Sequence, residues 1–190
     1  MILAIDKWVM EESFILYQKF QEKGLDYPIS FNISSQQFQR KDFVEDMRNL
    51  AERYNYKAGS LILEITEYTM IQDMVDVTKV MQELHTLGFS FAIDDFGTGY
   101  SNLHYMQELP IFELKIDKIF IDKIPADANS INMVHVMMDM GKRFGYRIVV
   151  EGVEQTEQAD AIYEINPNAV IQGYLYSMPI SQDEWFKKYS

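Results

Sequence analysis

The sequence predicts an α/β fold with a parallel β-sheet, arranged as a (β/α)8 barrel. Stretches typical of buried strands alternate with amphipathic helical stretches along all 190 residues, as in successive βα units. A polar side chain stands near the C-terminal end of each predicted strand, and these side chains are roughly 20 to 36 residues apart, which suits one βα unit each. A barrel gathers such side chains at one rim, whereas an open doubly wound sheet places its ligand at a single switch point. The pattern therefore favours the barrel.

The first part of the chain is expected to form a helix followed by two strands and their connection. Residues 3–23 carry apolar side chains at helical spacing and are followed by a glycine, which commonly ends a helix. The alternating pattern of residues 29–35 predicts a short strand, and residues 36–54 predict a polar helix. Residues 60–66 are apolar on both faces, as buried parallel strands are, except at Glu64.

The next helix is predicted at residues 71–87, and it leads into the stretch 89–103, FSFAIDDFGTGYSNL. This stretch combines an apolar strand, two adjacent carboxylates at Asp94 and Asp95, and a glycine-rich turn whose last residues begin another short helix. Adjacent carboxylates are costly to keep ionised unless a cation lies near them. Gly97 allows the backbone to approach a ligand closely. An ordinary strand-to-helix turn with an exposed Asp pair is the alternative interpretation.

The rest of the chain continues the alternation. Strands are expected at residues 111–117, 146–152 and 168–174, and helices at residues 130–144 and 181–189, with one further helix before the last strand. In the first of these strands apolar and charged side chains alternate, so the strand has one apolar and one charged face. The charged face holds Glu113, Lys115 and Asp117.

The composition limits the classes of protein that this chain can belong to. Hydrophobic residues make up 47% and aromatic residues 14%, which predicts one folded domain over residues 1–190. No cysteine is present, no apolar run reaches the ~20 residues that span a bilayer, and the N-terminus lacks a secretory signal pattern, so a cytoplasmic location is expected. The formal charge of −12 argues against polymeric nucleic acid as a partner, but not against a small phosphorylated ligand held through cations.

The predicted barrel is incomplete at its N-terminus. A complete barrel has eight strands and about 250 residues, whereas six strands are recognisable here. The chain also opens on a helix with no strand before it. We therefore expect about six βα units and an N-terminally truncated domain.

Oxygen-bearing side chains at the predicted strand ends suggest a metal site. Asn32, Glu64, Asp94, Asp95 and Glu151 form this set. Oxygen ligands without His or Cys select Mg²⁺ or Mn²⁺. Five such groups exceed what one Mg²⁺ usually takes from a protein, which favours two ions, with Asp94 or Asp95 as the bridging carboxylate of a phosphoryl displacement.

Other candidate residues surround this set. Lys115 is predicted to hold or activate the attacking water or to offset developing negative charge, and a purely structural pairing with the neighbouring acids is its alternative. Glu67 and Glu154 are interpreted as supporting or capping groups. Gln172 is predicted to contact a ligand edge, with a buried, satisfied amide as the alternative. Substrate contacts are also expected from two positions already named, Asp117 and Gly97.

Taken in order, six motifs resemble the EAL domain family of bacterial cyclic di-GMP phosphodiesterases. The motifs are FNISS, LEITE, IDDFGTGYSNL, LPIFELKIDKIF, VEGVEQ and QGYLYSMP, and IDKWVM near the N-terminus also fits. The resemblance implies a TIM-like barrel with one reversed strand, which hydrolyses cyclic di-GMP to linear pGpG with two Mg²⁺ or Mn²⁺ ions. It further implies a homodimer and, in the parent protein, a sensory or diguanylate-cyclase-like domain.

The resemblance also implies a role for individual residues. Four positions are similar to metal ligands of the family, namely Asn32, Glu64, Asp94 and Glu151, and Asp95 is similar to a ligand of the second ion. Lys115 resembles the residue that positions the water. Glu67 is similar to the glutamate that braces the loop at residues 96–101, which takes part in dimerisation in this family.

The chain departs from the family pattern in ways that keep a second function open. The Glu-Ala-Leu motif is absent, and with it one metal ligand and the arginine that usually follows. Val149 replaces a usual Ala and Tyr68 a common Ser. A cyclic di-GMP binding or regulatory module without turnover is therefore the first alternative. A metal-dependent barrel enzyme that abstracts a proton next to a carboxylate is the second.

Overall fold

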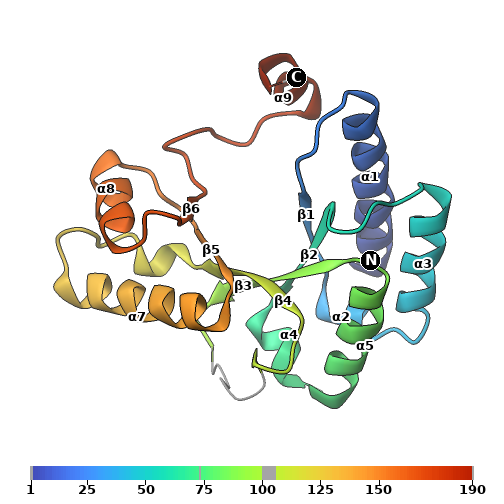
Figure 1. Ribbon diagram of the computed structural model, residues 1–190, viewed down its shortest axis with the longest axis horizontal. Helices are drawn as coiled ribbons and strands as arrows, with labels where there is room; N and C mark the ends of the chain where they lie inside the picture. The colour runs from blue at the N-terminus through green and yellow to red at the C-terminus, as the bar shows by residue number, and fades with distance from the viewer. Residues whose placement is uncertain (1, 73, 100–105, 190) are drawn as a thin grey trace. The chain divides into compact units, whose positions relative to one another are not determined.

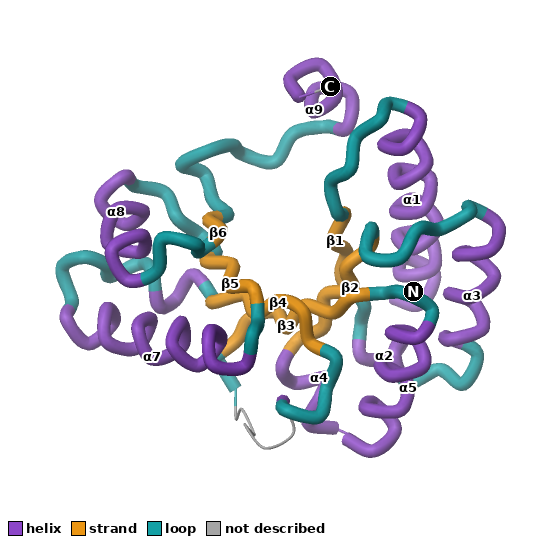
Figure 2. Tube along the Cα trace, in the orientation of Figure 1, coloured by secondary structure: helices purple, strands orange, loops and turns teal. Residues whose placement is uncertain are grey.

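The computed structural model describes residues 2–72, 74–99 and 106–189 and has an α/β fold (Figure 1). Six strands are hydrogen-bonded in chain order, from β1 to β6 (Figure 2). The strands are β1 (Ile29–Asn32), β2 (Leu61–Thr66), β3 (Ser90–Phe96), β4 (Ile111–Ile116), β5 (Arg147–Val150) and β6 (Val170–Ile171). The pairs β1–β2, β4–β5 and β5–β6 are parallel. The predicted fold class, with six strands alternating with helices, is confirmed.

Helices follow the strands as the alternation predicted. They are α1 (Ile2–Glu22), α2 (Ser35–Phe38), α3 (Phe43–Arg53), α4 (Glu67–Gln72), α5 (Met74–Thr86), α7 (Ala128–Phe144), α8 (Thr156–Ile165), α9 (Gln182–Tyr189) and the 3₁₀ helix η1 (Lys118–Phe120). The predicted start of a helix at residues 100–103 lies outside the described residues. Across the described part of the chain, we find no helix that combines the length and the apolar character needed to cross a membrane.

The predicted single helix at residues 36–54 is wrong, because the segment forms two helices. The Ser34 hydroxyl caps α2 by accepting a hydrogen bond from the Gln37 amide at 3.2 Å. The Arg40 guanidinium lies between the two helices and forms an ion pair with Asp46 in the first turn of α3, at 3.2 Å. A capped start for a short helix and an ion pair in the connection thus stabilise a break that the polar sequence pattern does not reveal.

Other predicted boundaries also differ from the structure. The strand predicted at residues 29–35 ends at Asn32, because α2 begins at Ser35. The helix predicted at residues 71–87 begins earlier, at Glu67, and is described as α4 and α5, with residue 73 between them outside the described residues. The strand predicted at residues 168–174 is limited to Val170–Ile171. It ends where Gly173 comes against the backbone of Val153, so the chain must leave the sheet there.

The chain divides into two compact units. Unit 1 comprises Met1–Ile93 and Asn102–Ile111, and unit 2 comprises Asp94–Ser101 and Phe112–Ser190. In unit 1, α1 packs against β1, α2 and α3. An aromatic cluster forms part of its core, with the ring of Phe89 stacked on Tyr56 at a centroid distance of 4.6 Å and the edge of Phe14 against Phe89 at 6.1 Å. Such pairs add specific geometry to apolar burial.

In unit 2, α7 packs against β5, α8 and η1 (Figure 1). The Asp127 carboxylate caps α7 by accepting from the Ser130 amide at 2.9 Å. Gly145, in the left-handed conformation with φ of 79°, ends the same helix. This capped helix supports the strands whose C-terminal ends carry the candidate site.

Gly173 should tolerate no side chain. A Cβ at this position would lie 2.0 Å from the carbonyl oxygen of Val153 and 2.5 Å from its nitrogen, so the backbone would have to move. We expect Gly173→Ala to lower the free energy of unfolding by roughly 2–3 kcal/mol, measured by chemical denaturation. Gly145→Ala is the control, since its Cβ would meet nothing within 4 Å and only the left-handed conformation costs about 1 kcal/mol. Equal losses in the two variants would contradict the close approach at Gly173.

Candidate active site

A buried lysine lies between two carboxylates in unit 2. The Nζ atom of Lys115 is 2.8 Å from Oδ1 of Asp94 and 2.9 Å from Oε1 of Glu151, and the lysine side chain is only 4% exposed. Burial of a charged amine at this depth is tolerated because opposite charges and hydrogen bonds surround it. Three positions predicted from strand ends, Asp94, Lys115 and Glu151, are therefore in direct contact.

The strand register explains why these residues meet. In the parallel pair β4–β5, Lys115 is level with Val149, and the Glu151 amide donates to the carbonyl of Ile116 at 3.0 Å. Because side chains alternate along a strand, Glu151 shares the sheet face of Val149 and hence of Lys115. Asp94 comes from the C-terminal part of β3, the strand that precedes β4 in the sheet.

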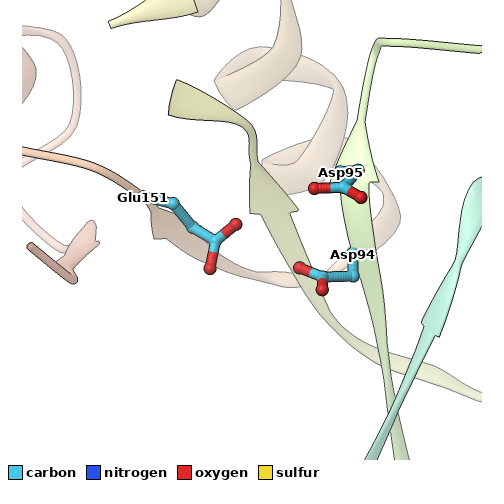
Figure 3. A group of neighbouring side chains, drawn as sticks. All are labelled: Asp94, Asp95 and Glu151. Carbon is cyan, nitrogen blue, oxygen red and sulfur yellow. The ribbon is translucent and has the colours of Figure 1, made fainter. Parts of the chain in front are cut away.

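Asp95 adds a third carboxylate to this group. One carboxylate oxygen from each of Asp94, Asp95 and Glu151 lies within 4.8 Å of the other two. Figure 3 shows the carboxylates of Asp94 and Glu151 pointing toward each other, with Asp95 next to Asp94 on β3. The arrangement concentrates negative charge, which the Lys115 ammonium group offsets in part.

Asp95 has an unfavourable backbone conformation, and its surroundings disfavour the ionised form of its carboxyl group. Its φ of 54° places a residue with a side chain in the left-handed region. Burial, the negative charge of Asp94 and a hydrogen-bonding contact with the Asp117 carboxyl group raise the pKa of Asp95 above its ordinary value, while Lys115 opposes this shift. Unfavourable features of this kind concentrate at functional sites.

Asp95→Asn should therefore stabilise the metal-free protein. We expect the free energy of unfolding at pH 7 to rise by roughly 1 kcal/mol, because Asn adopts the left-handed conformation more readily and removes a negative charge. The charge is present only where Asp95 is ionised, so the gain should shrink as the pH falls toward the ordinary aspartate pKa of about 3.9. Chemical denaturation with a chelator at pH 7 and pH 4 measures it. A loss of stability at pH 7 would contradict this description of the site.

Unit 1 places another pair of predicted residues side by side. Asn32 and Glu64 are register partners at the ends of β1 and β2. Glu64 is buried, at 8% exposure, whereas Asn32 is exposed. Glu67 is also buried and lies in the first turn of α4, just after β2. Since these residues belong to unit 1, a metal site shared with Asp94 and Glu151 stays a prediction.

The remaining predicted site residues lie near the same strand ends of unit 2. Gln172 directly follows β6 and is exposed, so the alternative of a buried amide is wrong. Asp117 directly follows β4, and its carboxylate accepts a hydrogen bond from the Ile119 amide at 2.8 Å, which caps η1. Gly97 follows β3 in the turn that begins at Asp95. Their contacts with a substrate stay predictions. The bracing of the loop at residues 96–101 by Glu67 also stays a prediction, because Glu67 belongs to unit 1 and the loop to unit 2.

Two contacts in unit 2 were not foreseen from the sequence. Lys118 forms an exposed ion pair with Glu154, which the sequence pattern had suggested only as a supporting group. Glu113 of β4 is buried and forms an ion pair with Arg147 of β5, its register partner, at 3.5 Å. The sequence shows that Glu113 and Arg147 carry opposite charges on two predicted strands. It does not show the register that places them opposite each other.

The donor set suits a hard divalent cation. Carboxylate oxygens without nitrogen or sulfur ligands fit Mg²⁺ or Mn²⁺ better than zinc or copper. The close approach of Asp94, Asp95 and Glu151 fits as well, because like charges at this distance are stabilised by a shared cation. The chemistry of these three residues thus fits the Mg²⁺ or Mn²⁺ ions that the side chains at the strand ends predicted.

Fold and site together define an α/β protein of the barrel type whose strand C-termini carry an acidic cluster with one buried lysine. The sequence model of the EAL domain matches residues 1–179, so the chain belongs to the EAL domain family. The resemblance noted from the motifs is confirmed.

Similar proteins agree with this assignment. The chain is 33% identical over 185 residues to the bifunctional diguanylate cyclase/cyclic di-GMP phosphodiesterase MucR of Pseudomonas aeruginosa, covering 97% of this chain and 27% of MucR. It is 32% identical to the cyclic di-GMP phosphodiesterase NbdA of the same species, covering 95% of this chain and 23% of NbdA. The solved MucR phosphodiesterase in complex with c-di-GMP superposes with a TM-score of 0.91 at 33% identity, over 96% of this chain and 74% of that one. The chain spans about a quarter of the length of these curated relatives.

Proposed function

We propose that this chain is the phosphodiesterase domain of a protein that hydrolyses cyclic di-GMP to linear pGpG with two Mg²⁺ or Mn²⁺ ions. The observation that carries the proposal is the contact of buried Lys115 with Asp94 and Glu151, next to Asp95. Hydrolysis needs a group that holds water or offsets developing charge, and a lysine held among the acidic side chains of the site can supply it. The names of MucR and NbdA support the same chemistry.

The residues of the cluster have distinct proposed roles. Asp94, Asp95 and Glu151 would hold the divalent ions, together with Asn32 and Glu64 from the neighbouring strand ends. When bound, such ions supply Lewis-acid stabilisation of the phosphodiester and lower the pKa of water. Lys115 orients a water through its ammonium group and stabilises negative charge on the phosphoryl oxygens.

The other predicted residues support this chemistry. Glu67 braces the turn after β3, and Gln172, Asp117 and Gly97 contact the substrate. Gln172 is exposed directly after β6, so its amide is available to a ligand at the strand ends.

A binding or regulatory module without turnover is the second candidate. The intact set of Asp94, Asp95, Lys115 and Glu151 favours the phosphodiesterase. No specific observation favours the proton-abstraction alternative.

Incubation with cyclic di-GMP and Mn²⁺, followed by chromatography of the nucleotides, tests the proposal. The 190-residue chain is compared with a form of the protein that also carries the Glu-Ala-Leu segment, and calorimetry measures binding in parallel. Linear pGpG from the form with the segment supports the phosphodiesterase. Binding without product in both forms supports the regulatory module, and the absence of binding in both overturns the two candidates.

The partners follow the same proposal. Cyclic di-GMP is the substrate, a homodimer is the proposed assembly, and sensory or diguanylate-cyclase-like domains are the proposed neighbours in the parent protein. MucR, whose name includes a diguanylate cyclase, supports the last point. The cytoplasmic location stays a prediction.

A further inference from the structure

The turn that carries Asp95 rests directly on two side chains of unit 2. Gly97 has a φ of 96°, and a Cβ built on it would lie 2.6 Å from Cε of Met137 and 2.9 Å from Cε2 of Phe120. The backbone of the turn is therefore in contact with the Phe120 ring of η1 and with the Met137 side chain of α7. Phe120 is half-buried and Met137 is buried, so neither is a freely moving surface group.

The same short helix contacts the turn at a second point. Asp117 caps η1 through the Ile119 amide at 2.8 Å, and its carboxyl group also contacts the carboxyl group of Asp95. Within η1, the Phe120 amide donates to the carbonyl of Asp117 at 3.2 Å. Both ends of η1 therefore contact the turn, one through the capping residue Asp117 and the other through the ring of Phe120.

Within the turn, Thr98 contacts the backbone of Asp95. Thr98 donates to the carbonyl of Asp95 through its amide at 3.3 Å and through its hydroxyl at 2.8 Å, and these contacts span three residues. A residue other than glycine in the left-handed region costs of order 1–3 kcal/mol and persists only where surrounding structure enforces it. For Asp95 that structure includes η1 and α7.

We propose that η1 and Met137 form a brace that holds Asp95 in its left-handed conformation, and that Phe120 is a positioning residue which sets the direction of the Asp95 carboxylate. The proposal deepens the proposed function in one respect, since Asp95 is taken there as a metal ligand. Phe120 itself touches neither ion nor substrate in this proposal and acts only through the turn.

Direct Mn²⁺ binding to the 190-residue chain, measured from the loss of the free Mn²⁺ electron paramagnetic resonance signal, is the first test. We expect Phe120→Ala to weaken Mn²⁺ affinity about 10-fold, as changes to groups that orient a metal ligand commonly do. Phe120→Leu keeps an apolar group against Gly97 and should restore most of the affinity. Phe144→Ala is the matched control, because it removes another half-buried ring, seven residues from Met137 on α7, and should leave affinity unchanged.

A double-mutant cycle separates positioning from a general loss of structure. If Phe120 acts through Asp95, Phe120→Ala should cause no further loss of Mn²⁺ affinity in an Asp95→Asn background. Additive losses in the double variant would overturn the proposal.

Hydrogen exchange gives a readout that does not depend on metal or on cyclic di-GMP. Phe120→Ala should speed exchange of the Thr98 amide about 10-fold or more while the amides of α8 keep their protection. Should Phe120→Ala lose the α8 protection as well, Phe120→Val is measured in its place, with the same expectation. Unchanged exchange at Thr98 would overturn the brace even if the protein hydrolyses cyclic di-GMP. Faster exchange in a protein that binds no Mn²⁺ would support the brace and overturn the proposed function instead.

Discussion

Asp94→Asn is expected to lower cyclic di-GMP turnover by about 10³-fold or more in the form that carries the Glu-Ala-Leu segment. The substitution keeps the size of the side chain but removes one charge from a residue that would hold the divalent ions. Bound ions supply several kcal/mol of charge stabilisation in the transition state, and each 1.36 kcal/mol is a factor of ten in rate. Initial rates of pGpG formation at saturating Mn²⁺ measure the effect.

Gln172→Ala is the control for this prediction. Gln172 is exposed directly after β6 and is proposed to contact only the substrate, so its loss should weaken turnover about tenfold or less. Asp94→Asn also leaves Lys115 paired with Glu151, at 2.9 Å, so the variant should fold. Near-normal rates for Asp94→Asn would contradict the proposal that Asp94 holds the ions needed for turnover.

The meeting of Asp94, Lys115 and Glu151 was predictable because it depends on few features of the chain. Each residue stands near the C-terminal end of a strand with a clear apolar pattern, and parallel strands bring such ends to one edge. The paired strands then only need to be aligned so that these side chains lie on the same face of the sheet and at about the same level. Lys115 and Glu151 meet this condition, since their strands pair with Lys115 level with Val149.

Other features of the site depend on contacts that leave no periodic pattern. The left-handed backbone of Asp95 and its contact with the Asp117 carboxyl group arise from the turn and from η1, which packs against that turn through Phe120. A three-residue 3₁₀ helix is too short to show a period. The sequence therefore indicated Asp117 as a substrate residue, whereas the structure gives it a cap and a neighbouring acid.

The division of the helix at residues 36–54 has a similar cause. Its polar side chains fit one exposed helix, but Arg40 forms an ion pair with Asp46 across the break. Ion pairs between residues six apart do not arise on one face of a regular helix, where partners lie three or four apart. The sequence pattern alone does not show whether one continuous helix or two helices joined at Arg40 is more stable, because the ion pair forms only in the folded chain.

Lys115→Met should destabilise the metal-free protein by about 3 kcal/mol at pH 7. Methionine matches the length of the lysine but leaves Asp94 and Glu151 without the ammonium group that contacts both, and removing one partner from a buried ion group typically costs 3–5 kcal/mol. Mn²⁺ should restore more stability to Lys115→Met than it adds to the wild type, because a cation then offsets the carboxylates that the lysine no longer reaches. Urea denaturation with a chelator and with Mn²⁺ measures both effects.

Lys118→Met is the matched control, since Lys118 forms its ion pair with Glu154 where both side chains are more than 40% exposed. Exposed pairs contribute about 0–1 kcal/mol, so this variant should lose little stability and should respond to Mn²⁺ as the wild type does. If Lys115→Met were as stable as Lys118→Met in the chelator, the charge of Lys115 would not be what keeps Asp94 and Glu151 together, and its role would have to lie in catalysis alone.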